Sequence, residues 1–81
     1  MPILFRAKGY CFFFYSNEGI PREPVHVHVR RGGDSAKIWL QPGISIADSY
    51  GFSSGELREL IEYVEIHASL IERNWHDYFG E

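Results

Sequence analysis

Two segments that alternate between apolar and polar side chains constrain this chain most. Val25–Arg30 and Ser35–Leu40 each place every second residue on one face of an extended strand. Gly32 and Gly33 stand between them, and a glycine pair is typical of a two-residue hairpin turn because glycine readily adopts the backbone angles that such a turn needs. The pattern therefore predicts an antiparallel β-hairpin.

The glycine turn also fixes the register of this hairpin. Counting outward from the turn pairs Arg31 with Asp34 and ends with His26 opposite Trp39. One face is then apolar and consists of Val25, Val27, Val29, Ala36, Ile38 and Leu40. The other face carries His26, His28, Arg30, Ser35, Lys37 and Trp39. A slip of one residue would expose the whole apolar set, so we expect this register and an apolar face turned to the core.

Further strands are expected on both sides of the hairpin. Ile3–Arg6 and Ile44–Ala47 are short strand candidates. The aromatic segment Tyr10–Tyr15 is apolar on both faces, which is typical of a central strand. Together these segments predict an antiparallel sheet of about four strands within residues 1–50.

One long helix is expected over residues 53–79. Ser53 and Glu56 have the spacing of a capping box, and apolar residues recur at helical spacing from Leu57 until Gly80, a plausible terminator. The sequence therefore predicts a single α+β domain over residues 1–81, in which the sheet packs on one C-terminal amphipathic helix. Tyr63, Ile66 and Leu70 widen the apolar arc beyond what one sheet face requires, which indicates either deeper burial or an interface with a second copy or another protein.

Composition indicates the compartment and the charge distribution. Cys11 is the only cysteine, so no internal disulfide forms, and no segment has the roughly 18 apolar residues of a membrane span. We expect a cytoplasmic protein that does not bind membranes. The net charge of −3 divides into +3 for residues 1–47, which carry six basic and three acidic residues, and −6 for residues 48–81. A basic sheet surface would suit an anionic partner.

His26 and His28 are the centre of the expected site, because they project from one strand face about 7 Å apart. Three kinds of chemistry fit them. The first is a metal site, which needs a third ligand such as Glu18, Glu23 or His67. The second is metal-independent RNA cleavage, with the two histidines as base and acid and Arg30 or Lys37 stabilising the phosphorane charge.

The third kind of chemistry is binding without catalysis. Trp39 could stack on a base, while Arg22 and Arg31 could contact phosphate groups or a partner protein. The glycines form no phosphate-binding loop pattern, and we expect no cofactor. The residues alone leave the metal, ribonuclease and binding interpretations open.

Four motifs together resemble a family of small bacterial proteins catalogued as domain of unknown function four-one-six-zero. They are Phe14-Tyr15-Ser16-Asn17-Glu18, Pro24-x-His26-x-His28-Val29, Ala36-Lys37-x-Trp39-Leu40 and Trp75…Tyr78-Phe79. Members often have Pro-Pro-His where this chain has Pro24-Val25-His26, a difference that affects the rigidity of the loop. Genes of the family commonly neighbour a gene for a second small domain, as in a toxin–antitoxin pair. The resemblance implies a cytoplasmic protein with a cognate protein partner, and it assigns no reaction.

The leading hypothesis is therefore a component of a toxin–antitoxin-like pair that acts through a protein partner and RNA. If the chain is the toxin, metal-independent RNA cleavage by His26, His28, Arg30 and Lys37 is the expected activity. The alternatives are a non-catalytic protein- or RNA-binding module, which includes the antitoxin role, and a metal-binding protein that uses His26 and His28.

Overall fold

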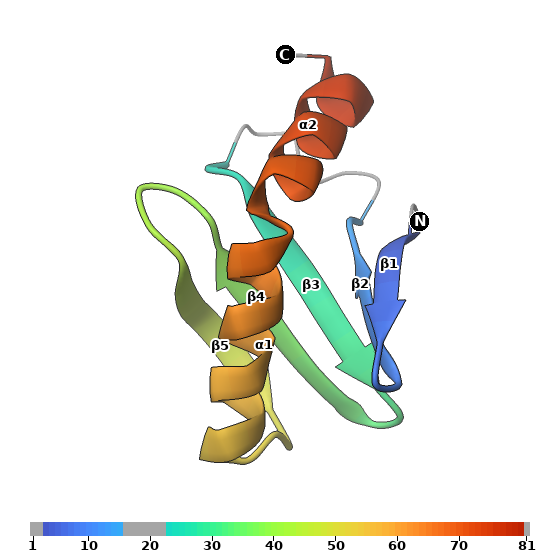
Figure 1. The fold of residues 1–81 in the computed structure, drawn as a ribbon, viewed down its shortest axis with the longest axis vertical. Coiled ribbons are helices and arrows are strands. Elements are labelled where there is room, and N and C mark those ends of the chain that lie inside the picture. Colours follow the sequence, from blue (N-terminus) through green and yellow to red (C-terminus); the bar gives the residue numbers. More distant parts are fainter. Residues whose placement is uncertain (1–2, 16–22, 81) are drawn as a thin grey trace.

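A five-stranded antiparallel sheet lies against two C-terminal helices in the computed structural model, which describes residues 3–15 and 23–80 (Figure 1). The sheet order follows the chain, β1-β2-β3-β4-β5. The strands are β1 (Ile3–Ala7), β2 (Tyr10–Phe13), β3 (His26–Arg31), β4 (Asp34–Trp39) and β5 (Ser45–Tyr50), and the helices are α1 (Ser54–Ile66) and α2 (Ala68–Phe79). The α+β class is confirmed, but the sheet has five strands instead of about four, and the helix is divided in two.

The β3–β4 hairpin has the predicted register at every position. Arg31 pairs with Asp34 next to the turn, and the ladder continues to His26 opposite Trp39. Gly32 has a φ of 59°, the left-handed conformation that a tight hairpin turn requires. All six residues of the predicted apolar face are buried, so the alternation identified the core correctly.

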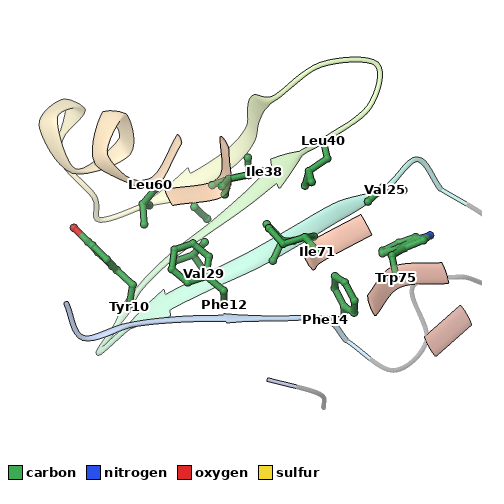
Figure 2. Close-up of a cluster of buried hydrophobic side chains, with 13 residues drawn as sticks. Tyr10, Phe12, Phe14, Val25, Val29, Ile38, Leu40, Leu60, Ile71 and Trp75 are labelled. Atoms are coloured by element: carbon green, nitrogen blue, oxygen red, sulfur yellow. The ribbon is translucent and has the colours of Figure 1, made fainter. Parts of the chain in front are cut away.

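The core lies between this apolar face and the inner sides of both helices. Figure 2 shows Leu60 of α1 and Ile71 of α2 pointing toward side chains of the sheet, among them Phe12 and Val29. Trp75 is fully buried and meets Phe14 with ring centroids 5.2 Å apart. Burial of side chains such as Leu60 and Ile71 contributes about 1.5–3 kcal/mol each to the stability of the folded state. The helices pack on one face of the sheet.

An extra residue interrupts the pairing of β5 with β4. Ile38 pairs with Ile46, but Lys37 pairs with Asp48, so Ala47 is a bulge. Because side chains alternate along a strand, the bulge reverses the faces of all residues that follow it. Ile46 therefore lies on the helix side with Ile38, and Asp48 lies on the opposite side with Lys37.

A second bulge lies in β1, on the other edge of the sheet. Ile3 pairs with Phe13 and Phe5 pairs with Phe12, which leaves Leu4 as the extra residue. Phe5 is thereby placed on the helix side, where its ring stacks on Phe12 with centroids 4.3 Å apart. Both outer strands thus contain one residue more than the strand they pair with.

The predicted single helix is wrong because the helix breaks at His67. Nδ1 of His67 lies 2.9 Å from the carbonyl oxygen of Tyr63, and the imidazole stacks on Phe5 with centroids 4.0 Å apart. These contacts draw His67 toward β1 and out of regular helical geometry, with φ at −103° and ψ at 16°. The predicted helix ends are confirmed: Ser53 and Glu56 form a capping box, and Gly80 ends α2 in the left-handed conformation.

Candidate functional site

A groove of about 430 Å³ crosses the open face of the sheet, by which we mean the face that the helices do not cover. Two rows of cross-strand neighbours run over this face. One row consists of Phe13, His28, Lys37 and Asp48, and the other of Cys11, Arg30, Ser35 and Tyr50. Tyr15, two residues after the end of β2, and Ser49 also line the groove. Four strands therefore contribute side chains to one site.

Aromatic rings line both ends of the groove. At the β2 end, His28 lies 4.6 Å from Tyr15 and 5.7 Å from Phe13, measured between ring centroids. At the β5 end, Tyr50 is 74% exposed, which is unusual for so large an aromatic side chain. Phe13 is buried, whereas Tyr15 and Tyr50 are exposed and offer flat surfaces on which a planar ligand can stack.

Two cations lie in the groove, and their surroundings differ. The guanidinium of Arg30 is 5.2 Å from the centre of the Phe13 ring, and the Arg30 side chain is exposed. Nζ of Lys37 lies 3.1 Å from a carboxylate oxygen of Glu23 and 4.4 Å from the centre of the Trp39 ring. Glu23 already balances the charge of Lys37, so Arg30 is the cation better placed to contact an anion.

His26 is fully buried, although its register places it on the open face. Nδ1 lies 2.9 Å from the carbonyl oxygen of Pro24. The imidazole is 5.0 Å from the Trp75 ring and 5.2 Å from the Trp39 ring. The pairing of β2 with β3 ends at His28, so no residue of β2 pairs with His26. Trp75 of α2 packs against His26 there. His26 was expected to be accessible on the open face, and its burial corrects that expectation.

The chain matches the family described as Domain of unknown function (DUF4160) over residues 9–76. It belongs to that family. Comparison with curated proteins and with solved structures gave no match. The matched region includes the whole groove, so this DUF4160 domain carries its candidate site within the part that defines the family.

The other predicted binding residues lie away from the groove. Arg31 is on the helix side, where it pairs with Glu56 and its guanidinium lies 4.6 Å from the centre of the Tyr10 ring. The hydrogen bond to Glu56 raises the pKa of Arg31. Trp39 is half-buried beside His26, and Arg22 lies outside the described residues.

The predicted partner interface is divided between core and surface. Tyr63 packs on Tyr10 and Phe12 with ring centroids 6.2 Å apart in both cases, so it belongs to the core periphery. Leu70 is half-buried, whereas Ile66 is 75% exposed. Burial therefore explains part of the wide apolar arc, and Ile66 remains exposed.

The described candidates for metal ligands do not form a set of three that could hold an ion. Among residues 3–15 and 23–80, no group of three His, Cys, Asp or Glu side chains is close enough to hold a metal ion. His67 lies on the helix side against Phe5, and Glu18 lies outside the described residues. Glu23 lies 3.7 Å from Nδ1 of His26, but it also binds Lys37.

No helix in the described part of the DUF4160 domain is long and apolar enough to cross a membrane.

Sequence reasoning missed half of the groove. Asp48 and Tyr50 were not considered because the predicted last strand ended at Ala47, where β5 in fact continues. Phe13 and Tyr15 were assigned to a strand but not to a site. Asp48 and Ser49 are both polar, so no alternation of apolar and polar side chains marks this part of β5, and the bulge at Ala47 breaks the period before it.

Proposed function

We propose that the protein binds single-stranded RNA on the open face of its sheet, as the non-catalytic member of a toxin–antitoxin-like pair. One observation carries this proposal: two exposed tyrosines and an exposed arginine line a single groove on a sheet face that the helices leave uncovered. Sequence-tolerant recognition of single strands combines aromatic stacking surfaces with cations in this way.

The groove supplies both kinds of contact. Tyr15 and Tyr50 stand at opposite ends, and a base stacked on an aromatic side chain contributes about 1–3 kcal/mol to binding. Arg30 projects from the row that also holds Tyr50. The guanidinium of Arg30 can donate hydrogen bonds to phosphate oxygens while a base stacks on the Tyr50 ring. Unpaired bases suit such an open sheet, whereas stacked bases of a duplex do not.

The charges of the two faces favour one orientation of the ligand. On the open face, the cations Arg6, Arg30 and Lys37 outnumber the anions Glu23 and Asp48. The helical region from residue 54 to residue 79 carries six acidic and two basic side chains, and it keeps an excess of negative charge although Arg31 and Lys8 pair with Glu56 and Glu59. It repels the phosphate backbone, so a nucleic acid is directed toward the sheet.

The burial of His26 favours binding over cleavage. General acid–base catalysis requires both groups to come within hydrogen-bond reach of the reacting atoms. His28 lines the groove, but His26 has no exposed surface and Nδ1 contacts the carbonyl oxygen of Pro24. Lys37 is held by Glu23. The two-histidine mechanism therefore lacks an accessible second group.

A cognate partner protein is the second element of the proposal. The toxin–antitoxin-like arrangement implied by the family resemblance provides such a partner, the product of the neighbouring gene. Ile66 is the exposed apolar side chain of the helix layer best placed to contact it, since the nearby Tyr63 and Leu70 are largely covered. RNA and partner would then bind opposite faces of one small domain.

Fluorescence anisotropy with labelled single-stranded RNA tests the binding proposal. Tyr50→Ala should weaken binding by roughly 5- to 100-fold through the loss of one stacking surface. Arg30→Ala should weaken binding and reduce its dependence on salt. Arg58→Ala is the matched control, because Arg58 is an exposed arginine on α1, and this variant should bind RNA like the wild type.

Two results would contradict the proposal. RNA that does not bind the wild-type protein, or that binds the Arg30→Ala and Arg58→Ala variants equally well, would exclude the groove. RNA cleaved in the presence of EDTA by the wild type but not by a His28→Ala variant would replace binding with catalysis.

A further inference from the structure

The bulge at Ala47 turns one carboxylate toward the groove. On the N-terminal side of the bulge, Ile46 faces the helices opposite Ile38. Without the extra residue, positions 48 and 50 would share that face with Ile46, because side chains repeat every second residue. With it, Asp48 and Tyr50 both lie on the open face. Bulges commonly redirect a side chain beside a functional site.

Asp48 is available to a ligand. Its side chain is exposed, and one carboxylate oxygen accepts a hydrogen bond from the backbone N–H of Ser49 at 2.9 Å. Its cross-strand neighbour Lys37 contacts Glu23, and within the described residues Asp48 forms no ion pair. The groove therefore contains a carboxylate, Asp48, whose two oxygens can accept hydrogen bonds, close to the exposed ring of Tyr50.

A carboxylate distinguishes bases by the donors that they present, since it can only accept hydrogen bonds. Guanine presents two adjacent donors, the ring N1–H and the 2-amino group, which match both oxygens at once. Adenine and cytosine place an amino group beside a ring acceptor, and uracil places its N–H between two carbonyl oxygens. In each of these three bases, an acceptor atom would lie against a carboxylate oxygen, and the two acceptors would repel each other.

We propose that Asp48 makes the groove selective for guanine, with the purine stacked on Tyr50 and its N1–H and 2-amino groups donated to the Asp48 carboxylate. This inference rests on the proposed RNA binding and specifies the base that the groove accepts. Asp48 and Tyr50 are next-but-one neighbours on the same face of β5, so one base can contact both.

The test uses short labelled uridine oligonucleotides that differ only in a central base, which is guanine, hypoxanthine or adenine. Hypoxanthine differs from guanine only by the missing 2-amino group. The wild-type protein should bind the guanine oligonucleotide roughly 10-fold more tightly than the hypoxanthine one, the discrimination typical of a good bidentate contact. Asp48→Asn should reduce this ratio to near one, and circular dichroism should show an unchanged fold because Asp48 is exposed.

Equal affinity of the wild type for guanine and hypoxanthine, with measurable binding of both, would overturn the selectivity and leave RNA binding intact. A ratio that persists in Asp48→Asn would also overturn it, because another group would then read the base. Failure of every oligonucleotide to bind would overturn the selectivity together with the proposed function.

Discussion

His26 shows how tertiary contacts decide the role of a residue. Its ring lies between Trp39 of the sheet and Trp75 of α2, and Nδ1 lies 2.9 Å from the carbonyl oxygen of Pro24. A carbonyl oxygen only accepts, so Nδ1 carries the proton and donates it. Burial of a polar ring costs little when it is hydrogen-bonded in this way. We therefore interpret His26 as a packing residue that joins the helix layer to the start of β3.

The structural role of His26 is tested by truncating it. His26→Ala should lower the free energy of unfolding by about 2–4 kcal/mol, because it leaves a cavity among aromatic rings and removes the hydrogen bond to Pro24. Arg30→Ala, an exposed site on the same strand, should change the free energy by less than about 0.5 kcal/mol. Urea unfolding followed by tryptophan fluorescence measures both. Equal stability of His26→Ala and the wild type would show that His26 is not packed as described.

At the scale of single elements, the sequence predicted the β3–β4 hairpin fully. Two alternating segments and a glycine turn specify one register, and both segments independently favour the same core face. The continuation of β5 past Ala47 could not be predicted, because a bulge has no sequence signature of its own and breaks the alternation that identifies a strand. The break at His67 was also hidden, since the helical spacing of apolar residues continues through it.

The burial of His26 could not be predicted either, because it depends on contacts between distant parts of the chain. A strand pattern reports which face a residue lies on, but not where the neighbouring strand ends. The space beside His26 depends on β2 ending its pairing opposite His28 and on Trp75 arriving from residues far along the chain. Local sequence patterns do not report such long-range contacts, although these contacts decide which side chains line the groove.

The start of α1 makes a prediction about pH. The pKa of Glu56 is lowered from its usual value of 4.5, first by the backbone N–H of Ser53 and then by Arg31. A carboxyl group whose pKa is lower in the folded than in the unfolded protein stabilises the folded state at pH values above the unfolded pKa. This contribution is lost as the pH falls through the folded pKa. Glu56→Gln keeps a capping side chain but removes the charge.

Chemical unfolding of both proteins at about pH 7 and about pH 3 provides the measurement. The wild type should be more stable than Glu56→Gln at neutral pH, and the difference should shrink in acid as Glu56 becomes protonated. Glu62→Gln is the control, because Glu62 is exposed on the same helix and forms no ion pair with the described residues. A difference between wild type and Glu56→Gln that stays constant with pH would contradict the stabilising role given to the charge of Glu56.

At the scale of the whole molecule, the two faces of the domain are chemically distinct. The open sheet face combines aromatic rings with a slight excess of cations, while the helix layer is acidic and exposes Ile66. Under the proposed function, RNA would bind the open sheet face and the partner protein would bind the helix layer. Substitutions on one face should therefore leave binding on the other unchanged.

Association through the helix layer is tested with Ile66. Replacing it by glutamate should abolish complex formation with the product of the neighbouring gene, because a charge would be buried at the interface. Since Ile66 is exposed, stability should change by less than about 0.5 kcal/mol, and RNA binding should persist. Light scattering of the mixed proteins gives the mass of the complex. A wild-type protein that stays monomeric, alone and with its neighbour, would rule out this interface.

The two outer strands have a consequence for the behaviour of many copies together. Leu4 in β1 and Ala47 in β5 are extra residues, and each lies in the strand that forms an edge of the sheet. A straight edge presents a regular series of amide and carbonyl groups on which another chain can extend the sheet, and this is how fibres grow. A bulge twists the edge and disturbs that regular spacing. Copies that meet at high concentration therefore find no straight strand to extend, and fibre growth is opposed at both ends of the sheet.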